Sequence, residues 1–421
     1  MSAASGDNRP RRAYTTLRHR DYRLLWGAEI FSTTGSQMQR VAIAWQVYDL
    51  TGDALKLGLL GLARFVPIII FGLVGGVLAD QRDRRQILFI SQSLLMLCSL
   101  TMAILTFTNS MSILVIYAMT VLTGALQAIG RPARQALIPN IVPRDELAGA
   151  ISMNTLSFQV STVAGPALGG FAIGAFGLGW VYLYDALAFV LTLAAIALMH
   201  ARPKIAAATQ RPLTAVIEGF SFLKGSPILL GVMSVDFIAT FFGAITTLMP
   251  IFADEILGSG PGTLGVLLAA PAVGSIIGGV MMSTRPIAVR PGFGVLAAVI
   301  VYGFSIFAFG LSTSFAISIA ALALSGASDA VSMVLRQTLR NLVTPNHLLG
   351  RISATHSMFA MGGPQLGEFR AGVMASMMGP GPAVAIGGAL TVASAAVIWR
   401  MVPGIASYTT TEGFSDPVPA D

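Results

Sequence analysis

Long apolar runs divide the whole sequence, and each could cross a lipid bilayer as a helix of about 20 residues. We count twelve, at roughly 24–48, 55–79, 87–108, 112–137, 148–176, 179–199, 228–252, 263–283, 293–311, 314–338, 350–378 and 381–401. Hydrophobic residues make up 54% of the 421 residues and charged residues only 11%, which is too apolar for a soluble protein of this length. We therefore predict an all-α membrane protein with twelve transmembrane helices in the lipid bilayer.

The positive charges indicate how these helices are oriented. Most of the 26 lysines and arginines lie before the first run or in alternate connections after it, and such connections normally face the cytoplasm. An even number of spans then predicts that both termini lie on the cytoplasmic side of the cell inner (plasma) membrane. The net charge of +7 would suggest nucleic-acid binding in a soluble protein, but here it reflects these arginines, so we expect no nucleic-acid partner.

The two halves of the sequence resemble each other. The stretch 124–143 aligns with 326–345 at an offset of 202 residues, which matches Arg134-Gln135 to Arg336-Gln337. Parallel repeats of this type build two pseudo-symmetric six-helix bundles with substrate between them near the midplane. The predicted parts are a basic cytoplasmic N-terminus at 1–23, a bundle at 24–199, a cytoplasmic linker at 200–227, a second bundle at 228–401 and a cytoplasmic tail at 402–421.

A charged loop separates the second and third runs. It reads Gly76-Val-Leu-Ala-Asp80-Gln-Arg-Asp-Arg84-Arg85. This Gly-x-x-x-Asp-x-x-x-Arg-Arg pattern resembles the loop signature of the major facilitator superfamily, although many members have Gly in place of Asp83. The resemblance implies the major facilitator fold. It also implies that Asp80 closes an inner gate against the start of the helix predicted at 350–378, where free amides attract an anion, with Arg84, Arg85 and Arg351 as counter-charges.

Two further motifs are similar to those of exporting branches of this superfamily. The inner end of the fourth run, Arg131-Pro-Ala-Arg134-Gln-Ala-Leu-Ile-Pro139, resembles exporters of siderophores and macrolides, as does the opening stretch 17–24. The fifth run contains Gly165-Pro166-Ala-Leu-Gly169-Gly170, which resembles the antiporter signature except that Ser161 stands where Gly is common. A proline that frees a carbonyl and small residues that admit a neighbouring helix make this segment a predicted hinge.

Five acidic residues fall inside the apolar runs: Glu29, Asp185, Asp236, Asp329 and Glu368. A charge at the bilayer centre costs about 2.5–3.5 kcal/mol on insertion scales, so each acid needs a reason. Aligning the first run with the seventh at an offset of 207 places Glu29 on Asp236, and the family resemblance implies that these helices line the central cavity. Buried carboxyls could bind and release protons near neutral pH, so both are candidate proton-coupling residues. The alternative is a structural role beside a serine or an arginine.

The other charged residues inside the runs have different expected roles. Arg40 lies three helical turns above Glu29 and is a candidate counter-ion or contact for a substrate anion. Asp185 is expected to hydrogen-bond within the helix bundle, and Asp329, which repeats Gln127, to occupy a polar cavity position. Two residues, Glu368 and Arg370, either pair locally or face the cavity, and the sequence does not decide between these alternatives.

These observations predict a secondary active transporter that exports an amphipathic organic compound by proton antiport with alternating access. Met, Phe and Gly are abundant and fixed charges are few, which favours a siderophore, a macrolide or another drug-like molecule as the small-molecule substrate. One chain with two halves needs no partner, so we expect a monomer. An importer or uniporter of the same fold and a non-transporting membrane sensor remain alternatives. A pump subunit would need an ATPase partner, because no Gly-x-x-x-x-Gly-Lys-Ser/Thr motif occurs.

An enzyme is not expected. The single cysteine, Cys98, precludes an intrachain disulfide or a thiolate cluster, and the sequence has neither a His-rich metal spacing nor a Ser-His-Asp pattern. We therefore expect no cofactor and no metal site.

Overall fold

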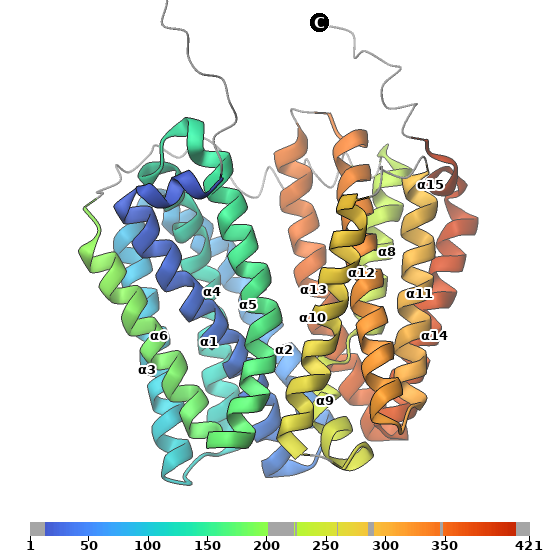
Figure 1. Ribbon diagram of the computed structural model, residues 1–421, viewed down its shortest axis with the longest axis horizontal. Coiled ribbons are helices and arrows are strands. Elements are labelled where there is room, and N and C mark those ends of the chain that lie inside the picture. Colours follow the sequence, from blue (N-terminus) through green and yellow to red (C-terminus); the bar gives the residue numbers. More distant parts are fainter. Residues whose placement is uncertain are drawn as a thin grey trace, which may run out of the picture.

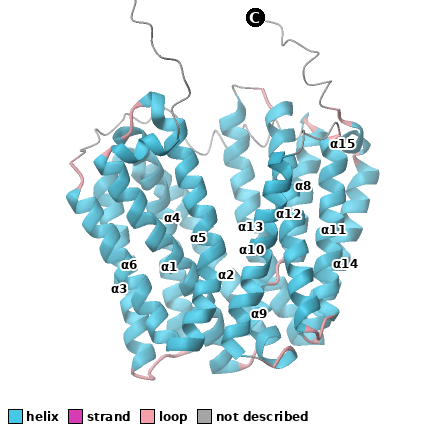
Figure 2. Ribbon diagram, in the orientation of Figure 1, coloured by secondary structure: helices cyan, strands magenta, loops and turns pink. Residues whose placement is uncertain are grey.

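The computed structural model describes residues 13–200, 223, 225–258, 260–284, 290–345 and 348–409, and every regular element in these ranges is a helix. Two groups of long helices stand side by side (Figure 1), and short loops join consecutive helices within each group (Figure 2). The first group comprises η1 (Ala13–Arg18), α1 (Arg20–Thr51), α2 (Ala54–Gln81), α3 (Arg84–Phe107), α4 (Ile113–Ile141), η2 (Arg144–Glu146), α5 (Leu147–Phe176) and α6 (Leu178–Leu198). The second comprises α8 (Pro227–Gly243), η3 (Thr246–Leu248), α9 (Met249–Ile251), η4 (Phe252–Ile256), α10 (Gly260–Thr284), α11 (Pro291–Leu311), α12 (Phe315–Val343), α13 (Leu349–Met378), α14 (Pro380–Met401) and α15 (Pro403–Ser407).

Each group thus holds six long helices, and we call the groups the first and second bundles. Ten helical segments in the described ranges are long and apolar enough to cross a membrane. The two long helices outside that set, α1 and α13, carry charged residues such as Glu29, Arg40, Glu368 and Arg370 along their length. Twelve long helices in two bundles confirm the predicted fold class.

The predicted seventh span is broken, unlike the others. Its helix α8 ends at Gly243, and the chain continues through the short turns η3 and α9 and the π-helical turn η4. The hydroxyl of Tyr302 on α11 donates to the carbonyl of Gly243 at 3.1 Å, which satisfies that group outside the helix. Pro250 lies in the turns that follow and has no N–H to donate back to Thr246.

The internal repeat is visible in the helix packing. α5 packs on α1, and its counterpart α13 packs on α8. Single residues, Gly177 and Gly379, separate α5 from α6 and α13 from α14. Both have a positive φ, 91° and 87°, which favours glycine. The two bundles also meet through small residues, since Gly58 of α2 faces Gly372 of α13 and Gly170 of α5 faces Gly265 of α10.

The bundles are joined mainly at one end. The first and last described helices, η1 and α15, lie at the same end of the molecule (Figure 1), which we call the terminal end, and η4 lies at the opposite, distal end. The largest buried apolar cluster, which includes Leu57 and Phe252, combines both bundles at the distal end, whereas each of the other clusters of described residues belongs to one bundle. The distal end is therefore closed by a shared core.

The described residues include little of the predicted linker and only part of the predicted N-terminus and tail. Most of the linker predicted at 200–227 lies outside the described residues, as do 1–12 and 410–421. The start of the predicted tail forms α15, whose Ile405 is buried in the core of the second bundle. This segment is therefore packed against the bundle.

Candidate functional site

The first candidate acid, Glu29, is paired with an arginine of its own bundle. Its Oε1 lies 3.2 Å from Nη2 of Arg134, so the pair joins α1 to α4. Both side chains are partly buried. Arg134 comes from the exporter-like stretch at the inner end of α4, and its neighbour Arg131 lies with its guanidinium carbon 5.8 Å from the ring centroid of Phe158 on α5. The two arginines therefore have different partners.

The second candidate acid, Asp236, lies at the centre of a larger cluster. Its Oδ1 is 3.0 Å from Nη2 of Arg336 on α12, and its Oδ2 is 3.3 Å from Nε2 of His356 on α13. Nη2 of Arg336 also lies 3.4 Å from Oδ1 of Asp329. Asp236 and Arg336 are buried, whereas the Asp329 side chain is 51% exposed, although its chain neighbours Ser328 and Ala330 are buried. Asp329 thus faces an open space beside the buried pair.

The two clusters are related by the internal repeat. Glu29 aligns with Asp236, and Arg134 aligns with Arg336, so each bundle carries one acid–arginine pair between its first and fourth long helices. We call these the paired sites. Gln127, the repeat counterpart of Asp329, is likewise exposed halfway along α4. The cavity role expected for Asp329 stays a prediction, and no ion pair or hydrogen bond between Glu29 and Asp236 occurs among the described side chains.

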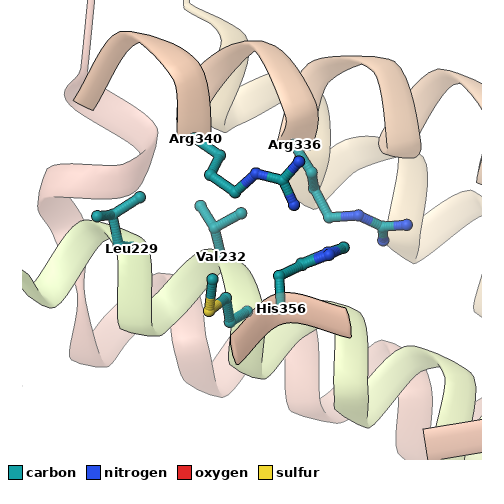
Figure 3. A pocket seen from close by; sticks show the side chains of 6 residues that line it. Leu229, Val232, Arg336, Arg340 and His356 are labelled. Carbon is teal, nitrogen blue, oxygen red and sulfur yellow. The ribbon is translucent and has the colours of Figure 1, made fainter. Parts of the chain in front are cut away.

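A small pocket adjoins the paired site of the second bundle. Figure 3 shows Arg336 and Arg340 reaching from α12 toward His356, while Leu229 and Val232 of α8 form an apolar side. Arg340 donates a hydrogen bond to Gln337, but its buried Nε has no partner. The pocket therefore combines positive charge with an apolar wall, and its polar atoms are only partly satisfied.

Further along the membrane region, an ion pair joins the two bundles. Nη1 of Arg64 on α2 lies 3.6 Å from Oε2 of Glu368 on α13. Arg40 on α1 interacts electrostatically with both. Arg370 is directed elsewhere, because it donates to the carbonyl of Phe242 on α8 at 2.8 Å. Glu368 and Arg370 therefore do not pair with each other, and Glu368 is a contact between bundles.

Asp185 lies away from these clusters, inside the first bundle. It is fully buried on α6 and accepts hydrogen bonds from Ser99 at 2.6 Å and Ser36 at 3.4 Å. Gln39 donates to the same Ser99 hydroxyl at 2.9 Å. The Gly35 backbone leaves room for the carboxylate, since an added Cβ would lie 2.7 Å from its Oδ1. This network ties α1, α3 and α6 together and agrees with hydrogen bonding within the bundle.

The predicted gate loop is only partly described. The side chains of Asp80 and Arg351 and the surroundings of Gly76 are not among those described, so the contact between Asp80 and the start of α13 stays a prediction. Two of the three loop arginines bind helix carbonyls of the first bundle, with Arg84 donating to Ala136 of α4 and Arg85 to Ala197 of α6, each at 3.1 Å. Ala197 is the residue before the last of α6, where a nearby positive charge is favourable.

The predicted hinge lies where α5 contacts two other helices. α5 continues as a helix through Pro166. Gly165 and Gly169 face Gln37 and Met38 of α1, and Gly170 faces the second bundle. Replacing any of these three glycines would push α5 away from a neighbour, because an added Cβ would meet backbone or side-chain atoms at 3.0 Å or less. The hinge role itself stays a prediction.

Sequence analysis did not identify two of the side chains in these clusters. His356 looked isolated in sequence but touches Asp236, and Arg64 looked unremarkable but reaches the other bundle. The repeat held a usable signal for the paired sites, because an acid and an arginine each recur at equivalent positions. No group of His, Cys, Asp and Glu suited to holding a metal ion occurs among the described residues.

Comparison with known proteins connects this architecture to transport. A family model described as transmembrane secretion effector matches residues 11–415. The enterobactin exporter EntS of Escherichia coli O1:K1 / APEC is 28% identical over 368 residues, which cover 86% of this chain and 87% of that protein. The enterobactin exporter EntS of Shigella boydii serotype 18 (strain CDC 3083-94 / BS512) is 27% identical over 366 residues, with the same coverage.

Solved structures share the fold. A bacterial homolog to the human lysosomal transporter Spinster, in an inward-facing and occupied conformation, superposes with a TM-score of 0.70 at 17% identity, covering 95% of this chain and 99% of that one. A D-xylose-proton symporter gives a TM-score of 0.68 at 14% identity, covering 94% and 99%. The family and the fold are those of transporters and not of enzymes. The chain therefore belongs to the transmembrane secretion effector family of the major facilitator superfamily and is a multi-pass membrane transporter.

Proposed function

We propose that this transporter exports an amphipathic organic compound across the cell inner membrane in exchange for protons. The observation that carries the proposal is the repetition of the acid–arginine pair, Glu29 with Arg134 and Asp236 with Arg336. Charged pairs between helices are costly to keep inside a membrane, so their presence in both bundles favours a role in transport. The proposed unit is a monomer, with its terminal end in the cytoplasm.

Protonation of the acid in a paired site would weaken the electrostatic link between the two helices that carry the pair. A proton on Glu29 removes the charge that attracts Arg134, and an arginine left without its partner in a low-dielectric region is strongly unfavourable. The arginine must then turn to water, and α1 and α4 lose an electrostatic link. Proton binding at Glu29 would thus favour one arrangement of α1 and α4, and a substrate that binds the deprotonated arrangement would be exchanged for the proton.

The paired site of the second bundle has an additional group that can take a proton. His356 lies against the Asp236 carboxylate, and imidazole can carry a proton at physiological pH. A proton arriving at Asp236 could be shared with His356, while Arg336 keeps a second carboxylate partner in Asp329. The two paired sites are therefore related by the internal repeat, but we expect protonation to have different effects on them.

Alternating access would use the contacts between bundles. The shared apolar core closes the distal end, so the substrate would enter from the terminal end in this conformation. Opening the distal end would separate α2 from α13 and α5 from α10, with the segment from Gly165 to Gly170 as the proposed hinge. The loop acid Asp80 would hold the terminal end shut in the opposite conformation.

The direction and the substrate class are supported by relatives. The similar proteins are named enterobactin exporters, which favours export and a siderophore, a macrolide or a comparable amphipathic molecule. An importer or a uniporter is the alternative, since the same fold also occurs in a D-xylose-proton symporter. A non-transporting membrane sensor would have the same helices but would move no substrate.

The test is flux in liposomes that contain the purified protein, with an imposed proton gradient and the neutral dye N-phenyl-1-naphthylamine, macrolides and siderophores as substrates. We expect gradient-driven flux for the wild type and its loss in Glu29→Gln. Asp49→Asn is the matched control, because Asp49 is an exposed acid at the far end of the same helix. Gradient-driven flux that survives in Glu29→Gln would remove Glu29 from the coupling mechanism. Absence of flux for every substrate would favour the sensor.

A further inference from the structure

The contact between α2 and α13 contains polar atoms without partners. Nη1 of Arg64 faces Glu368, but its Nη2 is buried and makes no hydrogen bond. Oε2 of Glu368 and Oε1 of Gln365, one turn earlier on α13, are also buried without a hydrogen-bond partner. Buried polar groups are rarely left unsatisfied, so such a cluster indicates a place for a ligand group or water.

Arg40 adds a second cation to this cluster. It is exposed, although the flanking residues Gln39 and Val41 are buried, so its side chain projects into open space inside the membrane region. It interacts electrostatically with Arg64, Glu368 and Arg131. Within the described part of the chain, Arg40 forms no hydrogen bond and no ion pair. Two arginines and one glutamate leave one positive charge uncompensated.

Aromatic rings lie further along the same contact between α2 and α13. An added Cβ on Gly362 of α13 would lie 3.3 Å from the ring of Phe65, which follows Arg64 on α2, and 4.0 Å from the ring of Phe237 on α8. Phe237 in turn stacks on Phe241 with centroids 6.0 Å apart. Both Phe65 and Phe237 are partly exposed. The site therefore offers an apolar surface next to its positive charge.

We propose that Arg40 and the free Nη2 of Arg64 form an anion subsite that binds the acidic group of an amphipathic substrate, with Phe65 and Phe237 contacting its apolar part. A guanidinium is suited to this task because its planar fork matches a carboxylate or sulfonate and it stays charged at any physiological pH. The inference rests on the proposed function and names its substrate class as an organic acid. An acid bound here balances the uncompensated charge while Glu368 keeps its place at Nη1.

The probe pair is 1-anilinonaphthalene-8-sulfonate and N-phenyl-1-naphthylamine, which share one aromatic framework and differ in the sulfonate. Binding is measured by fluorescence titration of the protein in nanodiscs of phosphatidylcholine, with empty nanodiscs subtracted. We expect saturable binding of the sulfonate to the wild type. Arg40→Gln should weaken it about tenfold or more, because a hydrogen bond to a charged group is lost, and should leave binding of the neutral dye unchanged.

Two further variants show whether charge is the cause. Glu368→Gln removes the competing carboxylate, so it should tighten sulfonate binding, a change that a purely structural role would not produce. Lys56→Gln is the matched control, because it removes one positive charge from a partly exposed residue at the distal end. It should leave the affinity for the sulfonate unchanged. An anionic lipid headgroup could occupy the same two arginines, so the titration is repeated in nanodiscs that contain phosphatidylglycerol. Loss of sulfonate binding to this lipid would mean that the subsite holds a lipid headgroup and would overturn the substrate assignment.

The outcomes separate this inference from the proposed function. Equal sulfonate affinity in wild type and Arg40→Gln, or no saturable sulfonate binding by the wild type, would overturn the anion subsite. If the wild type still moved the neutral dye along a proton gradient, the proposed function would stand without it. Sulfonate binding without flux of any substrate would support the subsite and count against the exporter.

Discussion

The substitution Gly58→Ala is predicted to shift the balance between the two access states. Gly58 lies in the first turns of α2, where a Cβ would be 2.8 Å from Cα of Gly372, 3.1 Å from the carbonyl oxygen of Phe369 and 3.3 Å from that of Glu368. All three atoms belong to the backbone of α13 and cannot rotate away. Ordinary contact begins at 3.4 Å, so the helices must separate by about 0.6 Å, the difference between 3.4 and 2.8 Å.

The expected size follows from the cost of overpacking. Inserting a methyl group into a packed contact costs about 1–3 kcal/mol, and here the cost falls on the conformation with a closed distal end. The equilibrium should then move toward the distal-open state by a factor of about 5–150. Gly72→Ala on the same helix is the control, because nothing lies within 4 Å of its added Cβ.

The assay is electron–electron distance measurement between spin labels at the distal end. Labels on Ser110→Cys, between α3 and α4, and Thr313→Cys, between α11 and α12, report the separation of the bundles from exposed positions. The one native cysteine, Cys98, is buried and is replaced by Ser first. We expect a growing long-distance population in Gly58→Ala only. An unchanged distance distribution in Gly58→Ala would refute the role of this contact in distal closure.

Three further predictions concern the charged groups. Arg336→Gln should lower thermal stability more than Asp236→Asn, by about 3–5 kcal/mol at most, because the buried Asp236 carboxylate then keeps only His356 beside it, whereas Asp236→Asn leaves Arg336 paired with Asp329. Equal melting temperatures would contradict this. Asp185→Asn should preserve folding, since the amide oxygen still accepts from one serine hydroxyl and the amide N–H can donate to the other, whereas Asp185→Ala should cost about 1–3 kcal/mol in a denaturation assay. Tyr48→Phe removes the hydrogen bond of 2.8 Å to Asp254, so the distal spin-label distance should lengthen, and no change would show that this bond does not hold the end closed.

The helices were largely predictable because the hydrophobic pattern that defines a membrane span is local. The span predicted at 55–79 is α2 at Ala54–Gln81, and the span at 381–401 is α14 at Pro380–Met401. The break in the seventh span was not predicted, although Pro250 lay within it. Its position depends on Tyr302, a residue 59 positions away from Gly243 that satisfies the carbonyl at the end of α8.

The candidate site was predicted as a set of positions and not as a set of contacts. The repeat alignment related Glu29 to Asp236 and Arg134 to Arg336, but it could not show that each acid meets the arginine of its own bundle. That contact depends on how α1 packs against α4. Glu368 could not be assigned from sequence for the same reason, because its partner lies on a helix of the other bundle.

His356 illustrates a different limit. A lone histidine inside an apolar run gives no sequence signal of a partner, and Asp236 precedes it by more than a hundred residues. Only the packing of α13 on α8 brings the imidazole to within 3.3 Å of the carboxylate. The proposed proton site of the second bundle therefore includes a group that periodicity and motifs could not reveal.

The most direct test of proton-coupled export measures proton and substrate movements in the same liposomes. A trapped pH-sensitive dye reports protons while the fluorescence of N-phenyl-1-naphthylamine reports the substrate, for wild type, Glu29→Gln and the control Asp49→Asn. We predict opposite movements of dye and protons in the wild type and the control, and loss of both in Glu29→Gln. Movement of the two in the same direction would establish a symporter, and substrate movement without protons a uniporter, and either result would contradict proton antiport.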